Sequence, residues 1–152
     1  RVLYIDCESG SIDDYLDTYP GIKEYMNNVI KEAHERGYVK TIMNRKRVIE
    51  ELNNRNYMIR SMGERMALNT PIQGSSADIL KKAMIEIYNE FNRLGLKSKM
   101  LIQVHDELVF NVLNSEKETV KEIVTNIMEN TYKLSVPLKV EINEGNNWYE
   151  AK

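Results

Sequence analysis

Hydrophobic residues recur every three to four positions in several stretches of the chain, a spacing typical of helices that bury one face. The first such stretch runs from Pro20 to Arg36, with the proline suited to a first helical turn and Gly37 to a C-cap. The second covers residues 54 to about 68. Three methionines share one face of it, and we expect that face to join the core: Met58, Met62 and Met66.

Thr70-Pro71 interrupts the second helical pattern, because proline lacks a backbone donor and disfavours helical geometry in the residue before it. A new helix is expected to start there, run to about Leu94 and end at Gly95. It opens at residues 73–77, where small side chains allow another backbone or a bound duplex to approach closely. Taken alone, these residues favour plain helix packing. A further helix follows residues 115–118, whose pattern predicts a capping box.

Apolar and polar residues alternate in four shorter stretches, which predicts β-strands at residues 38–43, 99–104, 107–112 and 138–142. The second and third of these are separated only by His105-Asp106, so they are expected to form a tight hairpin. The last follows Pro137 and has the character of an edge strand. Together the elements predict an α+β fold, an antiparallel sheet with a central β-hairpin packed against several α-helices.

Composition fits one globular domain, since the 152 residues are 42% hydrophobic and 29% charged. The single cysteine, Cys7, excludes an internal disulfide framework. No apolar run approaches the roughly 20 residues that span a bilayer, and the N-terminus lacks the features of a signal peptide. We therefore expect a cytoplasmic protein with no membrane partner.

The net charge of -2 gives no global sign of nucleic-acid binding, so any such role must rest on a local patch. Lys40 to Arg47 is the candidate, with four cationic residues around a turn at Asn44. The charge run by itself favours an ordinary solvated hairpin.

The stretch QVHDELVF, residues 103–110, places three titratable side chains at the predicted hairpin turn. Carboxylates exposed there suit Mg²⁺, which needs only one or two protein carboxylates when substrate phosphates complete its shell. A structural zinc site fits less well, since His34, His105 and Cys7 are too few ligands. The pattern alone also describes an ordinary solvated turn.

Three segments, 19–26, 64–79 and 103–110, occur in the order and with the residues of the C-terminal part of family A DNA polymerases, which the chain resembles from about Ile12 to Lys152. The resemblance includes Val136-Pro137-Leu138 and Asn147-Trp148 near the end. It implies a palm-like region, residues 12–152, of a DNA-directed DNA polymerase that acts in DNA replication or repair. Residues 1–11 stay unassigned.

The resemblance also implies roles for individual residues. Asp106 would bind the catalytic Mg²⁺ ions, two in the complete enzyme, with Glu107 in a supporting part and His105 at the primer terminus. Primer-template DNA and dNTP are the implied partners. Polar residues near the active site would touch template and primer: Arg65, Asn69 and Gln73. A basic turn would hold the template backbone: Arg45, Lys46 and Arg47.

The chain also departs from the family pattern. The basic turn lacks the glycine that the family favours before it and the proline near its end. We find neither the second metal-binding aspartate motif nor the fingers helix, and the thumb and exonuclease regions are missing. We therefore expect a fragment with little or no polymerase activity by itself. The lower-ranked alternatives are a non-catalytic duplex-binding module and a metal-dependent phosphohydrolase.

Overall fold

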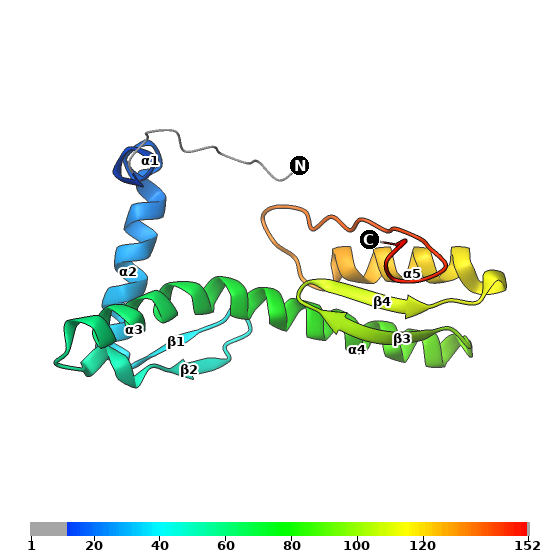
Figure 1. Ribbon diagram of the computed structural model, residues 1–152, viewed down its shortest axis with the longest axis horizontal. Helices are drawn as coiled ribbons and strands as arrows, with labels where there is room; N and C mark the ends of the chain where they lie inside the picture. The colour runs from blue at the N-terminus through cyan, green and yellow to red at the C-terminus, as the bar shows by residue number, and fades with distance from the viewer. Residues whose placement is uncertain (1–11, 152) are drawn as a thin grey trace. The chain divides into compact units, whose positions relative to one another are not determined.

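The structure is a computed structural model that describes residues 12–151 (Figure 1). The chain divides into two compact units, Arg1–Gly74 and Ser75–Lys152. The unassigned segment 1–11, with Cys7, and the last residue lie outside the described range. Of the helices between residues 12 and 151, none has both the length and the hydropathy that crossing a membrane requires.

The helices of the first unit are α1 (Ile12–Thr18), α2 (Pro20–Arg36), the 3-10 helix η1 (Glu50–Asn53) and α3 (Tyr57–Asn69), followed by the π-helical turn η2 (Thr70–Gly74). Helix α2 has the predicted bounds, and Gly37, with φ of 72°, donates its N–H to the Ala33 carbonyl as a left-handed C-cap. Helix α3 begins where the Asn56 side chain accepts a hydrogen bond from the Met58 N–H.

A small apolar core holds the first unit together: Ala33, Val39, Ile49, Leu52 and Ala67, with Val29 and Met66 packed against it. The expected methionine core face is wrong for two of its three members. Met58 is 78% and Met62 57% exposed, while Met66 alone packs against the core. Helix α3 therefore turns a different face inward, and buries the small residues Gly63 and Ala67.

The strands of the first unit are β1 (Tyr38–Lys40) and β2 (Lys46–Val48), which pair antiparallel. The predicted strand 38–43 is shorter because the chain turns at Thr41. The Thr41 N–H donates to the Arg45 carbonyl at 3.0 Å, and the Asn44 N–H donates to the Thr41 carbonyl at 2.9 Å. Asn44 adopts a φ of 63°, a conformation that asparagine tolerates better than most residues.

The second unit contains α4 (Ser75–Leu94), the hairpin β3 (Lys99–Val104) and β4 (Glu107–Asn111), the 3-10 helix η3 (Asn114–Glu116) and α5 (Lys117–Asn130). Helix α4 ends at Gly95, with φ of 66°, as expected. One face of the hairpin packs on the two helices through apolar side chains: Ile87, Phe91, Val120 and Val124, with Met100, Leu108 and Phe110. The α+β class and the hairpin are thus confirmed.

Residues 138–142 do not form the predicted strand, and the two sheets of the described range have two strands each. Side chains of α5 hold this segment in place of a strand ladder. The Val140 N–H donates to the Glu129 carboxylate at 3.2 Å, and Glu144 forms ion pairs with Lys117 and Lys121. These ion pairs lower the pKa of Glu144, and the one with Lys117 has the largest effect.

The predicted capping box is also wrong. Helix α5 has no side-chain hydrogen bond at its N-cap, and Ser115 lies in η3. The Glu116 carboxylate accepts hydrogen bonds from the Lys97 and Ser98 N–H groups and not from its own helix.

Candidate functional site

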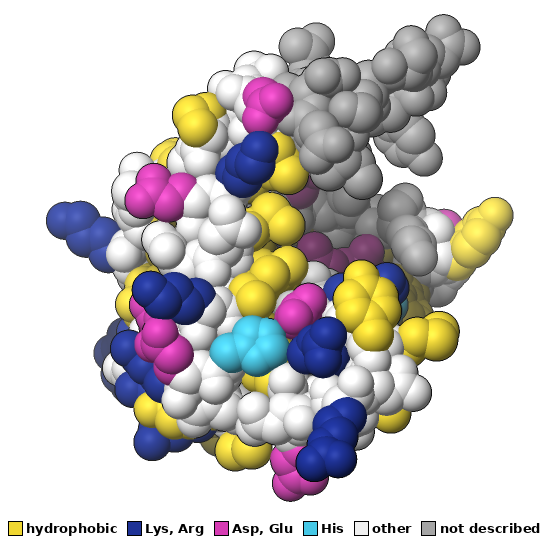
Figure 2. Space-filling view, turned by 90° about the vertical axis from the view of Figure 1, so that its left-hand side faces the viewer, with side chains coloured by type: hydrophobic (Ala, Val, Ile, Leu, Met, Phe, Trp, Pro, Cys, Tyr) yellow, Lys and Arg dark blue, Asp and Glu magenta, His cyan; other side chains and the backbone are white. Residues whose placement is uncertain are grey.

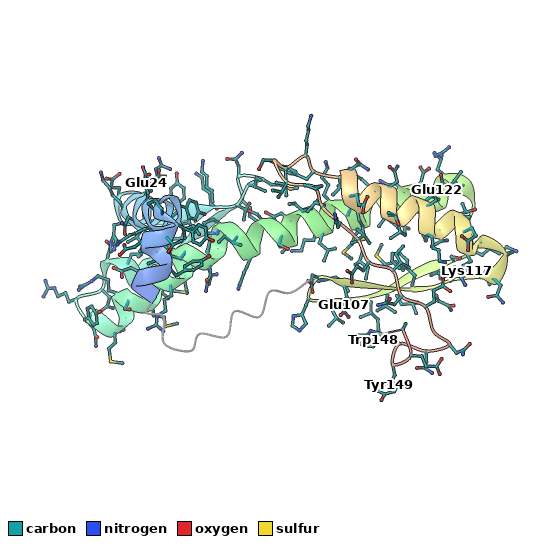
Figure 3. All side chains as sticks on the ribbon, turned by 90° about the horizontal axis from the view of Figure 1, so that it is seen from above. Glu24, Glu107, Lys117, Glu122, Trp148 and Tyr149 are labelled. Atoms are coloured by element: carbon teal, nitrogen blue, oxygen red, sulfur yellow. The ribbon has the colours of Figure 1, made fainter. Side chains whose placement is uncertain are left out.

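The turn between β3 and β4 presents His105, Asp106 and Glu107 to solvent. Val104 and Glu107 are the last paired residues, so His105 and Asp106 form the two-residue loop. All three polar side chains are exposed, and Glu107 lies at this end of the hairpin while Lys117 lies toward the other end of the unit (Figure 3). The expected placement of carboxylates at an exposed hairpin turn is what the structure shows.

His105 adopts a φ of 54°, which is uncommon for a residue with a side chain and costs roughly 1–2 kcal/mol relative to ordinary backbone geometry. The Gln103 side-chain amide donates to the His105 carbonyl at 2.6 Å and so bridges the turn. Backbone strain of this kind gathers at functional sites, where the surrounding structure maintains it.

The opposite end of the hairpin is fastened by Glu116. Its carboxylate accepts hydrogen bonds from the Lys97 N–H at 3.0 Å, the Ser98 N–H at 2.8 Å and the Ser98 hydroxyl at 2.6 Å. The Ser98 Oγ accepts in turn from the Leu113 N–H at 3.1 Å. These hydrogen bonds lower the pKa of Glu116, and the one from the Lys97 N–H has the largest effect. One carboxylate thus links the start of β3 to the segment that follows β4.

The hydrogen bonds of Glu116 were not predicted from the sequence. Their one signal was an acidic residue shortly after the hairpin, at Glu116, and that signal was assigned to a capping box.

The donor set at the turn fits a hard divalent cation in part. Mg²⁺ takes only one or two carboxylates from protein when substrate phosphates and water complete its shell, and Asp106 and Glu107 are two exposed carboxylates that could serve. Across residues 12–151 no three His, Cys, Asp or Glu side chains gather into a group that could hold a metal by protein ligands alone.

In the first unit, two arginines of the basic turn contact η2. Arg45 donates through Nη2 to the Gly74 carbonyl at 3.3 Å. Arg47 donates through Nη1 to the Thr70 hydroxyl at 3.1 Å and through Nη2 to the Met66 sulfur at 3.3 Å. Lys46 differs, since its ammonium lies 4.8 Å from the centre of the Tyr38 ring, a cation–π contact.

Arg65, Asn69 and Gln73 follow one another at intervals of four residues along the end of α3 and into η2, and all three are exposed. These predicted DNA-contacting residues thus lie near the end of α3 and in η2, and two arginines of the basic turn donate hydrogen bonds to η2. Figure 2 shows basic, acidic and hydrophobic side chains interspersed on the face that it presents.

His34, one of the few residues in the sequence that could ligate zinc, contacts Glu64. Its Nε2 lies 3.1 Å from the Glu64 Oε1, and both side chains are about one-third exposed, at 34% and 33%. The contact joins α2 to α3 one residue before Arg65. No signal in the sequence pointed to this pair.

The comparisons with known proteins agree over nearly the whole chain. The model of DNA polymerase family A matches residues 8–150. The chain belongs to DNA polymerase family A. Its relatives include DNA polymerase I of Bacillus subtilis, 49% identical over 146 residues, and DNA polymerase I of Caldicellulosiruptor bescii, 50% identical over 141 residues. The alignments cover 95% and 93% of this chain and 17% of each relative.

Among solved structures, the chain resembles the POL domain of Pol1 from M. smegmatis in complex with DNA primer-template and dNTP. The TM-score is 0.88 and the identity 41%, over 91% of this chain and 24% of that one. The family A resemblance and the fold expected from it are confirmed. The chain spans about one-sixth of the length of the curated relatives named above.

Proposed function

We propose that this chain supplies part of the palm of a DNA-directed DNA polymerase, which transfers a nucleotide from dNTP to a primer 3′-OH under the direction of a template. The observation that carries the proposal is the family A match over residues 8–150. A relative of the same fold that was solved with primer-template and dNTP supports the choice of partners. Such a substrate belongs with the chromosome in replication or repair, so we place the protein in the bacterial cytoplasm.

The family resemblance suggests a role for each residue of the turn. Asp106, with Glu107 beside it, would hold Mg²⁺, two ions in the complete enzyme, and the ions would stabilise the attacking and leaving oxygens of phosphoryl transfer. His105 would contact the primer terminus. The Gln103 bridge and the hydrogen bonds of Glu116 would hold this turn in place before DNA arrives, since catalysis of this kind depends on positioning.

The first unit would hold the nucleic acid. Lys46 offers an exposed cation for the template backbone, as the sequence also predicts for Arg45 and Arg47. Arg65, Asn69 and Gln73 offer donors to minor-groove acceptors, which every base pair presents. An enzyme that copies any sequence needs contacts of these two kinds.

Duplex binding and primer extension with Mg²⁺ test the proposal, using this chain and Asp106→Asn, with Glu122→Gln as the matched control. Glu122 is an exposed carboxylate on α5 (Figure 3), so its change to an amide removes the same charge. We expect salt-sensitive duplex binding in all three proteins and little extension in any, because the sequence carries no second metal-binding aspartate motif. Absence of duplex binding would overturn the proposal.

A metal titration tests Asp106 without relying on activity. Mn²⁺, a paramagnetic stand-in for Mg²⁺, is expected to broaden the amide resonances of the β3–β4 turn in the wild-type chain and in Glu122→Gln. The same broadening in Asp106→Asn would remove Asp106 from the metal site.

A further inference from the structure

The π-helical turn η2 is an unusual piece of backbone that needs an explanation. Turns with i→i+5 hydrogen bonds are rare and concentrate at functional sites. Pro71 accounts for the break in α-helical geometry, because a proline ring collides with the carbonyl four residues earlier in a regular helix. The proline does not by itself select one alternative geometry, so other contacts must fix the form of the turn.

The first residue of the turn is held by Arg47. Thr70 is 4% exposed, and its hydroxyl donates to the Met66 carbonyl at 2.7 Å. The same oxygen accepts from Arg47 Nη1 at 3.1 Å, while Arg47 Nη2 reaches the Met66 sulfur. The buried hydroxyl thus donates one hydrogen bond and accepts another. The bond from Arg47 links β2 to the start of η2.

The last residue of the turn is held by Arg45 and by close packing. The Gly74 carbonyl accepts from Arg45 Nη2 at 3.3 Å. A Cβ atom on Gly74 would lie 2.8 Å from the Thr41 Cγ2, a distance that forces something to shift. Thr41 is 5% exposed, and its Oγ1 accepts the Arg45 N–H at 3.1 Å. The basic turn therefore lies directly against the end of η2.

Between these fixed ends lie Pro71, Ile72 and Gln73, and the last two are exposed. We propose that Arg47, assisted by Arg45, is a positioning residue that holds η2 in the π form and so sets how Gln73 is presented to DNA. Arg47 then acts through Thr70, and this role replaces the contact with template phosphate that the family resemblance implies for it. This inference rests on the proposed function for its DNA part only.

Amide hydrogen exchange of Ile72, Gln73 and Gly74 tests, without DNA, whether the two arginines hold η2 in the π form. Arg47→Gln is expected to speed this exchange by about tenfold, because a charge-assisted hydrogen bond to a buried hydroxyl is lost. Lys46→Gln is the matched control, since it removes the same charge from the neighbouring position of β2 and should leave the exchange unchanged.

Two further measurements keep the exchange result interpretable. The core amides of Ala33 and Leu52 should keep their protection in every variant, which shows that the unit still folds. Thr70→Val should reproduce the effect of Arg47→Gln, and Thr70→Ser, which retains the hydroxyl, should restore slow exchange. Unchanged exchange in Arg47→Gln or in Thr70→Val would overturn the inference.

Salt dependence of duplex binding tests the DNA part. Removing one phosphate contact lowers the slope of log K against log salt by about 0.9. Lys46→Gln should show that loss, whereas Arg47→Gln should weaken binding with its slope unchanged. A slope reduced by the Arg47 change would make Arg47 a phosphate ligand and overturn the inference. If the wild-type chain binds no duplex, the proposed function fails. The exchange experiment then still decides whether Arg47 holds η2 in the π form.

Discussion

Replacing Gly74 by alanine tests how closely the basic turn packs against η2. Alanine would gain about 0.5–1 kcal/mol from its higher helix propensity, because the Gly74 φ is not in the left-handed region. Against this, the added methyl would lie 2.8 Å from the Thr41 Cγ2. Overpacking in a tight site costs about 1–3 kcal/mol. Thr41 is buried and cannot rotate freely without losing its bond from the Arg45 N–H. We therefore expect a net destabilisation of about 1–2 kcal/mol.

A second change isolates the contact. Thr41→Ser removes only Cγ2 and keeps the hydroxyl, so Gly74→Ala in that background should lose most of its penalty. Such a pair of neighbours should show a coupling of about 1–2 kcal/mol in a double-mutant cycle. Gly21→Ala is the control, since nothing lies within 4 Å of the added methyl and alanine should be tolerated or favourable there.

Exchange of the first unit's core amides, Ala33 and Leu52, is the appropriate measurement. Tryptophan fluorescence would not report on this unit, because Trp148 lies in the second unit. Additive effects of the two substitutions, or a stabilising Gly74→Ala, would refute the close packing on which the reasoning depends.

Three further outcomes are expected. His105→Gly should stabilise the second unit by about 0.5–1 kcal/mol, because glycine removes the cost of the left-handed φ. The midpoint of unfolding, followed by Trp148 fluorescence, should rise, and a lower midpoint would contradict this. The depressed pKa of Glu116 adds stability that is present above the ordinary glutamate pKa and lost as the pH falls through the depressed one. The protection factor of the Ser98 amide should fall over that window, and Glu116→Gln should abolish the dependence. Gly63→Ala should cost the first unit about 1–3 kcal/mol in denaturant unfolding, because its Cβ would lie 3.0 Å from a backbone nitrogen of η1; a neutral change would show that η1 can move away.

Local chemistry fixed those parts of the fold that the sequence predicted well. Pro20 and Gly37 set the two ends of α2, and Gly95 ended α4, because these residues restrict or permit backbone angles whatever surrounds them. The hairpin of β3 and β4 was equally accessible, since two alternating stretches separated by two residues leave little choice of pairing.

The expectations that proved wrong each depended on a tertiary contact that cannot be inferred from the sequence pattern. Alternation at residues 138–142 is compatible with a strand, but a strand requires a neighbouring edge, and side chains of α5 hold the segment instead. The methionine face of α3 was expected in the core, but the helix turns the face with Gly63 and Ala67 inward. Helix α3 packs against η1 through Gly63, whose missing side chain allows close approach, and so two of the methionines stay in solvent.

The same limit applies to the charges of the candidate site. Sequence alone presents Arg45, Lys46 and Arg47 as one basic run with one purpose. In the structure, both arginines donate hydrogen bonds to η2, while the Lys46 ammonium lies over a tyrosine ring. A guanidinium has several fixed donors and can bracket a turn of backbone, whereas an ammonium is a compact charge with no such geometry. The division of labour within the run therefore follows from side-chain shape, and it becomes visible only when the partner of each cation is known.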